Sequence, residues 1–94
     1  MGLLFEWDEA KHLANLRKHG VSFDEAATIF GDTLSVTIED PGHSSREFRF
    51  VTLGYSAKQR LLTVVHIERG HRIRIISACK ATRTERKAYE EGET

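Results

Sequence analysis

The sequence predicts an α+β domain in which two N-terminal helices precede a four-stranded antiparallel sheet and a C-terminal helix. Three observations support this fold class. Apolar residues recur at helical spacing before Gly31, they alternate with polar residues between residues 34 and 78, and residues 82–85 form a capping box. A chain of 94 residues, 39% hydrophobic and 30% charged, has room for one modest core, so residues 1–94 are expected to form a single domain.

The two N-terminal helices are bounded by residues that favour helix ends. Asp8 is a good N-cap, and Gly20 suits the left-handed position that follows a helix. Ser22 and Glu25 have the spacing of a capping box, so a second helix is expected to start at once and to end at Gly31. The short connection makes the pair an αα-hairpin.

The central segment has the period of two that indicates β-strands. Strands are expected at about residues 33–39, 46–54, 60–68 and 71–78, with a turn at residues 40–42. Residues 3–7 are apolar except for Glu6 and are compatible with a further brief strand. One face of the sheet is expected to pack on the helices. We assign these residues to that face: Leu34, Val36, Ile38, Phe48, Phe50, Val65, Ile67, Ile73 and Ile75.

The hairpin between the last two strands determines which polar side chains meet. A three-residue loop at residues 69–71 keeps the apolar side chains of both strands on one face, so we prefer it to a two-residue loop. The expected pairs are Glu68–Arg72, His66–Arg74, Phe48–Ile67 and Phe50–Val65. The other face would then carry two rows of ionisable residues: Glu47, Glu68 and Arg72 in one, and Arg49, His66 and Arg74 in the other.

Charge is distributed unevenly along the chain, although the net charge is zero. Residues 58–87 contain nine Lys or Arg and two Asp or Glu, a net of +7 that points to an anionic partner. Two interpretations of the ionisable face remain open. One is a solvated surface with weak cross-strand ion pairs. The other is a site for phosphodiester chemistry, because His or Glu can act as acid and base while Arg binds phosphate oxygens.

Simple counts argue against several classes of protein. A single cysteine, Cys79, rules out an intrachain disulfide and a multi-cysteine zinc site, and the histidines lack metal-ligand spacing. The sequence has no glycine-rich phosphate loop, no apolar run long enough to span a bilayer and no secretory signal. We therefore expect a cytoplasmic protein that uses no metal or other cofactor.

The sequence resembles the BrnT toxin family over nearly its whole length. The resemblance rests on these segments: Phe5-Glu6-Trp7-Asp8, residues 15–23 (NLRKHGVSF), Glu47-Phe48-Arg49-Phe50, Gly54, residues 74–78 (RIISA), residues 80–82 (KAT), Glu85-Arg86 and Tyr89. It implies a RelE-like fold and a ribonuclease toxin of a type II toxin–antitoxin operon, which cleaves RNA without metal and inhibits translation. It also implies a small antitoxin of the ribbon-helix-helix kind, which forms a hetero-oligomer with the toxin and carries it to operator DNA.

The resemblance also suggests which residues act. The family motif carries over directly to Lys18, His19, Glu47, Arg49 and Arg74, whereas His66, Glu68 and Arg72 rest mainly on the expected register. We expect Glu47, His66 and Glu68 to share the acid and base roles, with neither role assigned to one residue. The residues expected to bind RNA or phosphate are Arg49, Arg72, Arg74, Lys18, His19, Lys80 and Arg83.

One departure from the family pattern keeps a second function open. The family usually has Arg where this chain has Cys79, and Lys80 or Arg83 could compensate for the missing charge. The alternative to an active toxin is therefore a catalytically weakened or inactive homologue, which binds the antitoxin and regulates the operon.

The predicted C-terminal helix, from about residue 82 to residue 92, has a thin apolar face. Ala88 and Tyr89 provide most of it, which is little for a helix of about ten residues. We expect this helix to be loosely held in the free protein and the antitoxin to dock on or near it.

Overall fold

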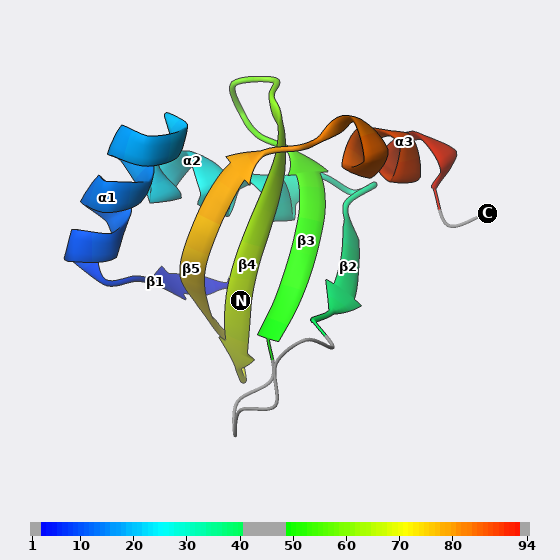
Figure 1. Ribbon diagram of the computed structural model, residues 1–94. Helices are drawn as coiled ribbons and strands as arrows, with labels where there is room; N and C mark the ends of the chain where they lie inside the picture. Colours follow the sequence, from blue (N-terminus) through cyan, green and yellow to red (C-terminus); the bar gives the residue numbers. More distant parts are fainter. Residues whose placement is uncertain (1–2, 41–48, 93–94) are drawn as a thin grey trace.

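The computed structural model describes residues 3–40 and 49–92 and contains a five-stranded mixed sheet with helices on both sides (Figure 1). The elements are β1 (Leu4–Glu6), α1 (Glu9–His19), α2 (Phe23–Ala27), the 3-10 helix η1 (Thr28–Gly31), β2 (Val36–Glu39), β3 (Arg49–Tyr55), β4 (Leu61–Arg69), β5 (Arg72–Lys80) and α3 (Arg83–Glu91). The strand order is β1-β5-β4-β3-β2. The α+β class is confirmed, but the sheet is not purely antiparallel, because β1 pairs with β5 in parallel. None of the helices within the described residues could cross a membrane.

The N-terminal helices begin and end where the sequence indicates. The Asp8 side chain caps α1, and Gly20 ends it in the left-handed conformation, with a φ of 72°. The Ser22 hydroxyl accepts the Glu25 N–H and so caps α2. The capping box is not completed, because the Glu25 carboxylate accepts a 2.9 Å hydrogen bond from Arg60 Nε instead. This buried carboxylate ties the β3–β4 loop to the start of α2.

The register predicted for the β4–β5 hairpin is wrong by one residue. Its loop has two residues, 70 and 71, and Gly70 takes the left-handed conformation with a φ of 62°, which suits a tight hairpin. The pairs next to the loop are Arg69–Arg72, Glu68–Ile73, Ile67–Arg74 and His66–Ile75. A β-bulge between Val65 and His66 then shifts the pairing. The predicted pairs Glu68–Arg72 and His66–Arg74 do not form.

The register predicted between β3 and β4 is wrong in the same way. Arg49 lies opposite Ile67, and Phe50 lies opposite His66 rather than Val65. The cause is that β4 is apolar on both faces, since seven of its nine residues are buried or nearly so. Alternation of apolar and polar residues therefore cannot fix which face of β4 is buried against the N-terminal helices.

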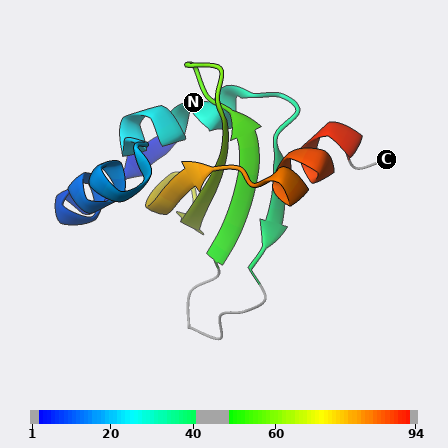
Figure 2. The ribbon, with the colours of Figure 1, turned by 45° about the horizontal axis from the view of Figure 1, so that its top comes forward.

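The sheet has an inner face, which packs on α1, α2 and η1, and an outer face, which α3 partly covers; Figure 2 shows α3 on the side away from α1 and α2. The apolar residues that we assigned to one face are divided between the two. Phe50, Ile73 and Ile75 are on the inner face, whereas Val36, Ile38, Val65 and Ile67 are on the outer face. Leu34 is 72% exposed, and Phe48 lies outside the described residues.

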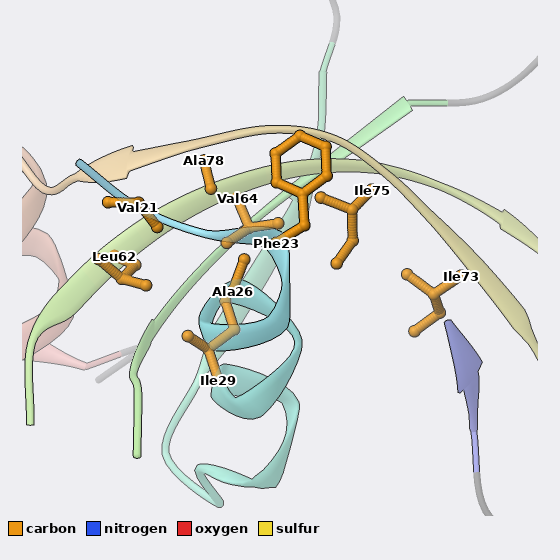
Figure 3. Close-up of a cluster of buried hydrophobic side chains, with 9 residues drawn as sticks. All are labelled: Val21, Phe23, Ala26, Ile29, Leu62, Val64, Ile73, Ile75 and Ala78. Carbon is orange, nitrogen blue, oxygen red and sulfur yellow. The ribbon is translucent and has the colours of Figure 1, made fainter. Parts of the chain in front are cut away.

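The hydrophobic core lies between the inner face and the N-terminal helices. Figure 3 shows side chains from α2 and η1 meeting those of β4 and β5. Its members are Val21, Phe23, Ala26, Ile29, Leu62, Val64, Ile73, Ile75 and Ala78. The short helices α2 and η1 thus supply Phe23, Ala26 and Ile29, and five of the other members come from β4 and β5.

Asn15 attaches α1 to the edge of the sheet. Its side-chain amide donates to the carbonyls of Ala78 and Val21, at 2.7 and 2.9 Å, and its Oδ1 accepts the Ala78 N–H at 3.1 Å. The side chain is buried, so all three hydrogen bonds form away from water.

The C-terminal helix is present as predicted, with Thr82 and Glu85 forming a complete capping box. No residue of α3 is buried, and two of its side chains make hydrogen bonds to the rest of the protein. The Tyr89 hydroxyl donates to Asp32 Oδ2 at 2.6 Å, and Glu85 Oε1 accepts from Thr63 Oγ1 at 2.9 Å. These contacts join α3 to β4 and to the segment before β2.

Candidate functional site

Three of the predicted phosphate-binding residues share the outer face at one end of the sheet. Arg49 lies opposite Ile67, Ile67 lies opposite Arg74, and Arg74 pairs with Glu6 of β1. Arg72 precedes Arg74 by two residues in β5 and therefore points the same way. We call the group formed by Glu6, Arg49, Arg72 and Arg74 the arginine face.

Glu6 is the member of the arginine face that sequence reasoning missed. Its Oε1 lies 3.4 Å from Arg72 Nη1, and its Oε2 lies 3.5 Å from Arg74 Nη1. The site arises because β1 pairs in parallel with β5, and three residues of parallel strand leave no alternation from which this register could be deduced.

His66 lies on the inner face, so its predicted place beside Arg49 and Arg74 is wrong. The side chain is fully buried between aromatic rings, edge-on to Phe30 at 5.0 Å and stacked on Phe50 at 5.9 Å. Its Nε2 lies 2.7 Å from Thr52 Oγ1. A ring enclosed in this way cannot touch a substrate on the outer face.

Neither His66 nor Glu68 joins the arginine face. Burial lowers the pKa of His66 to about 4, so its ring is neutral at pH 7. The His66 Nδ1 is buried without a hydrogen-bond partner among the described residues, and Glu68 Oε2 is 3.7 Å from it. Glu68 is therefore on the inner face with His66 and not beside Arg72. Glu47 lies outside the described residues.

Lys18 and His19 line a separate groove between α1 and β5. This shallow groove of about 290 Å³ also contains Lys11, Asn15 and Ser77. Ser77 is three residues beyond Arg74 in β5, so the groove and the arginine face occupy different parts of the same strand.

Lys80 and Arg83 are exposed at the far end of β5, together with the residue that departs from the family pattern. Six residues separate Arg74 from Lys80, which is roughly 20 Å of extended chain. Cys79 lies opposite Thr63, and burial together with the Glu85 carboxylate raises the pKa of its thiol. The predicted phosphate-binding residues therefore fall into three places instead of one surface.

An apolar groove lies beside the arginine face, between α3 and the outer face of β2 and β3. It has a volume of about 230 Å³, and its lining residues are Val36, Ile38, Val51, Leu53, Thr84, Glu85 and Ala88. Ile38 is 59% exposed, which is high for a large apolar side chain in a strand. Arg49 continues the same face of β3, two residues before Val51.

The arrangement is suited to binding an anion on the outer face. Guanidinium groups present several N–H donors in a geometry that matches phosphate oxygens. In residues 3–40 and 49–92, no three His, Cys, Asp or Glu side chains are grouped so that they could hold a metal ion.

Comparison with known proteins identifies the family of this chain by sequence and a solved structure with the same fold. Residues 7–85 match the family described as the ribonuclease toxin BrnT of a type II toxin–antitoxin system. The crystal structure of the Brucella abortus ribonuclease toxin BrnT superposes with a TM-score of 0.60, at 21% sequence identity, over 88% of this chain and 99% of that one. At this identity the superposition shows a shared fold. No curated protein gives a significant match in sequence.

Proposed function

The chain belongs to the BrnT ribonuclease toxin family of type II toxin–antitoxin systems, and from this premise we propose that it cleaves RNA at the arginine face. The observation that carries the proposal is the presence of Arg49, Arg72 and Arg74 on one face of the sheet, at the same end. The RNA substrate, the resulting arrest of translation and a cytoplasmic site of action are all parts of this proposal.

The proposed reaction is attack of a ribose 2′-oxygen on the adjacent phosphorus, which forms the 2′-O–P bond and breaks the P–O5′ bond. A base takes the proton of the 2′-hydroxyl, and an acid gives a proton to the departing 5′-oxygen. Negative charge grows on the phosphate oxygens in between. The three arginines would stabilise that charge, so the reaction as proposed does not depend on a metal ion.

Glu47 is our remaining candidate for acid–base catalysis among the three that the sequence suggested. We support it by its position two residues before Arg49 in the sequence and by its place in the family motif. His66 and Glu68 lie on the inner face, away from the three arginines, so we do not propose them for proton transfer there. Lys18 and His19 would bind RNA beyond the cleaved bond, in the groove beside Ser77.

The antitoxin is the expected partner of a type II toxin, and we propose that a small DNA-binding antitoxin docks on α3 and the apolar groove next to it. Val51, Leu53 and Ala88 form an apolar floor there, and Arg49 lies at its edge. This combination fits an amphipathic segment with acidic residues. Such a hetero-oligomer would bring the toxin to operator DNA through the antitoxin.

A weakened toxin that acts only as a binding partner is the second candidate function. Cys79 favours it, because this position on the outer face lacks the positive charge that most family members have there. The two functions differ in one measurable property, which is cleavage of RNA by the purified protein.

The test combines purified protein with expression in cells. We expect wild-type protein to cleave RNA and to arrest growth, with arrest relieved by the neighbouring antitoxin gene. Arg74→Ala should lower the cleavage rate about 100-fold with little loss of stability, since Arg74 is partly exposed. Arg17→Ala is the matched control, because it removes the same charge from an exposed site on α1. Wild-type activity in the Arg74→Ala protein would place the site elsewhere, and inactivity of the wild type would favour the second function.

A further inference from the structure

Glu6 contacts both arginines of β5, whereas an ordinary surface ion pair joins one acidic and one basic side chain. Each of its carboxylate oxygens contacts a different guanidinium, Oε1 at 3.4 Å from Arg72 and Oε2 at 3.5 Å from Arg74. The two arginines are alternate residues of one strand, so their Cα atoms are roughly 7 Å apart. The single carboxylate therefore bridges two like charges that would otherwise repel each other.

The bridge leaves most of each guanidinium available. Both contacts use only Nη1, and an arginine has five N–H donors. The Arg72 and Arg74 side chains are 59% and 36% exposed, so both can be reached from solvent. Exposed ion pairs of this kind contribute little to folding. The main physical effect of Glu6 is accordingly on where the two guanidiniums lie.

We propose that Glu6 is a positioning residue. It holds Arg72 and Arg74 at a spacing that lets both guanidiniums bind one phosphate group in the transition state. This inference rests on the proposed function, because the phosphate belongs to the RNA that is cleaved. Glu6 acts through the arginines and takes no proton in the reaction. A misplacement of about 1 Å in such groups can cost a large factor in rate.

The distinguishing variant is Glu6→Gln, which keeps the size of the side chain. Its amide oxygen can accept from one arginine, but its NH2 group cannot accept from the other. We expect the single-turnover cleavage rate to fall by about ten-fold, because the guanidiniums lose their common partner. RNA affinity should be unchanged or higher, because the site loses a negative charge. The expected signature is thus a lower kcat without a higher KM.

The matched control is Glu9→Gln. It changes the net charge equally, but Glu9 is 70% exposed on α1 and its contact is with His12. Equal rates for Glu6→Gln and Glu9→Gln would overturn the inference. Loss of one limb of the pH–rate profile in Glu6→Gln alone would also overturn it, since that result would make Glu6 the acid or base.

A measurement without RNA separates this inference from the proposed function. In the free protein, the NMR signals of the Arg72 and Arg74 guanidiniums should shift and broaden in Glu6→Gln and stay unchanged in Glu9→Gln. Unchanged signals in both variants would refute the positioning role. Failure of wild-type protein to cleave RNA would refute the ribonuclease function, and the NMR comparison would still decide whether Glu6 holds the two arginines.

Discussion

The buried ring of His66 should make the stability of this protein sensitive to mild acid. The side chain has no exposure to solvent, and burial lowers its pKa from the usual 6.5 to about 4. In the unfolded chain the same ring binds a proton near pH 6.5. Between pH 6.5 and pH 4 the unfolded state therefore binds more protons than the folded state. The contribution of the neutral His66 to the free energy of unfolding is present above pH 6.5 and is lost as the pH falls through this window.

The size of the effect follows from the two pKa values. A pKa of about 4 in the folded protein against 6.5 in the unfolded chain corresponds to about 3 kcal/mol of unfolding free energy. The loss grows by about 1.4 kcal/mol per pH unit while the unfolded ring is protonated and the folded ring is neutral, so more than half of it is reached by pH 5. Between pH 7 and pH 5 we expect the free energy of unfolding to fall by about 2 kcal/mol through His66 alone.

Urea unfolding of wild-type protein and His66→Gln at pH 7 and pH 5 measures this contribution. Glutamine does not titrate, and its side chain can still hydrogen-bond to Thr52 in place of the imidazole. Other groups that lose stability in acid, including Glu25 with its lowered pKa, act equally in both proteins and cancel in the comparison. The reasoning would be refuted if His66→Gln lost as much stability as wild type over this pH range.

Three further predictions concern α3, α1 and the outer face. Tyr89→Phe removes the hydrogen bond to the Asp32 carboxylate and should cost about 1–2 kcal/mol, with faster amide exchange confined to α3; unchanged exchange in α3 would show that other contacts hold it. Asn15→Ala leaves buried backbone groups of β5 without partners and should lower the free energy of unfolding by about 3 kcal/mol in urea, whereas a loss below about 1 kcal/mol would mean that water replaces the amide. Cys79→Arg places a positive charge near the Glu85 carboxylate and should raise RNA affinity a few-fold, and no change in affinity would remove Cys79 as a reason for weakened activity.

The helix boundaries could be predicted because local chemistry determines them. Asp8, Gly20 and Thr82 act within one turn of their own helix, so the sequence contains the whole signal. The existence of the strands from β2 to β5 was predictable for a similar reason, since alternation and turn residues are also local. The faces of those strands depend on more distant neighbours.

The prediction of the site was wrong where the register of a strand that is buried on both faces decides which side chains meet. Apolar residues occupy successive positions of β4, so a shift of one residue satisfied the pattern equally well and moved His66 to the wrong face. The bulge after Val65 shifts the strand register once more, and no short sequence motif predicts it. Arg72 and Arg74 were placed on the correct face relative to each other, because they are two residues apart in one strand. Glu6 joins them only through the pairing of β1 with β5, which are more than sixty residues apart in the sequence.

The bonds that Asn15 makes with Ala78 give the sheet two unlike edges. A strand that approached β5 from outside would find the N–H and the carbonyl of Ala78 already occupied, and β1 already paired with Arg72–Arg74. At the opposite border, β2 is the last strand of the described sheet, and its outer backbone groups face away from the other strands. An added strand, whether from a partner or from a second copy, is therefore excluded at Ala78, whereas no described strand pairs with the outer side of β2 or of the three-residue β1. A side-chain amide in α1 thus closes the part of β5 that β1 does not cover, at Ala78, to strand addition.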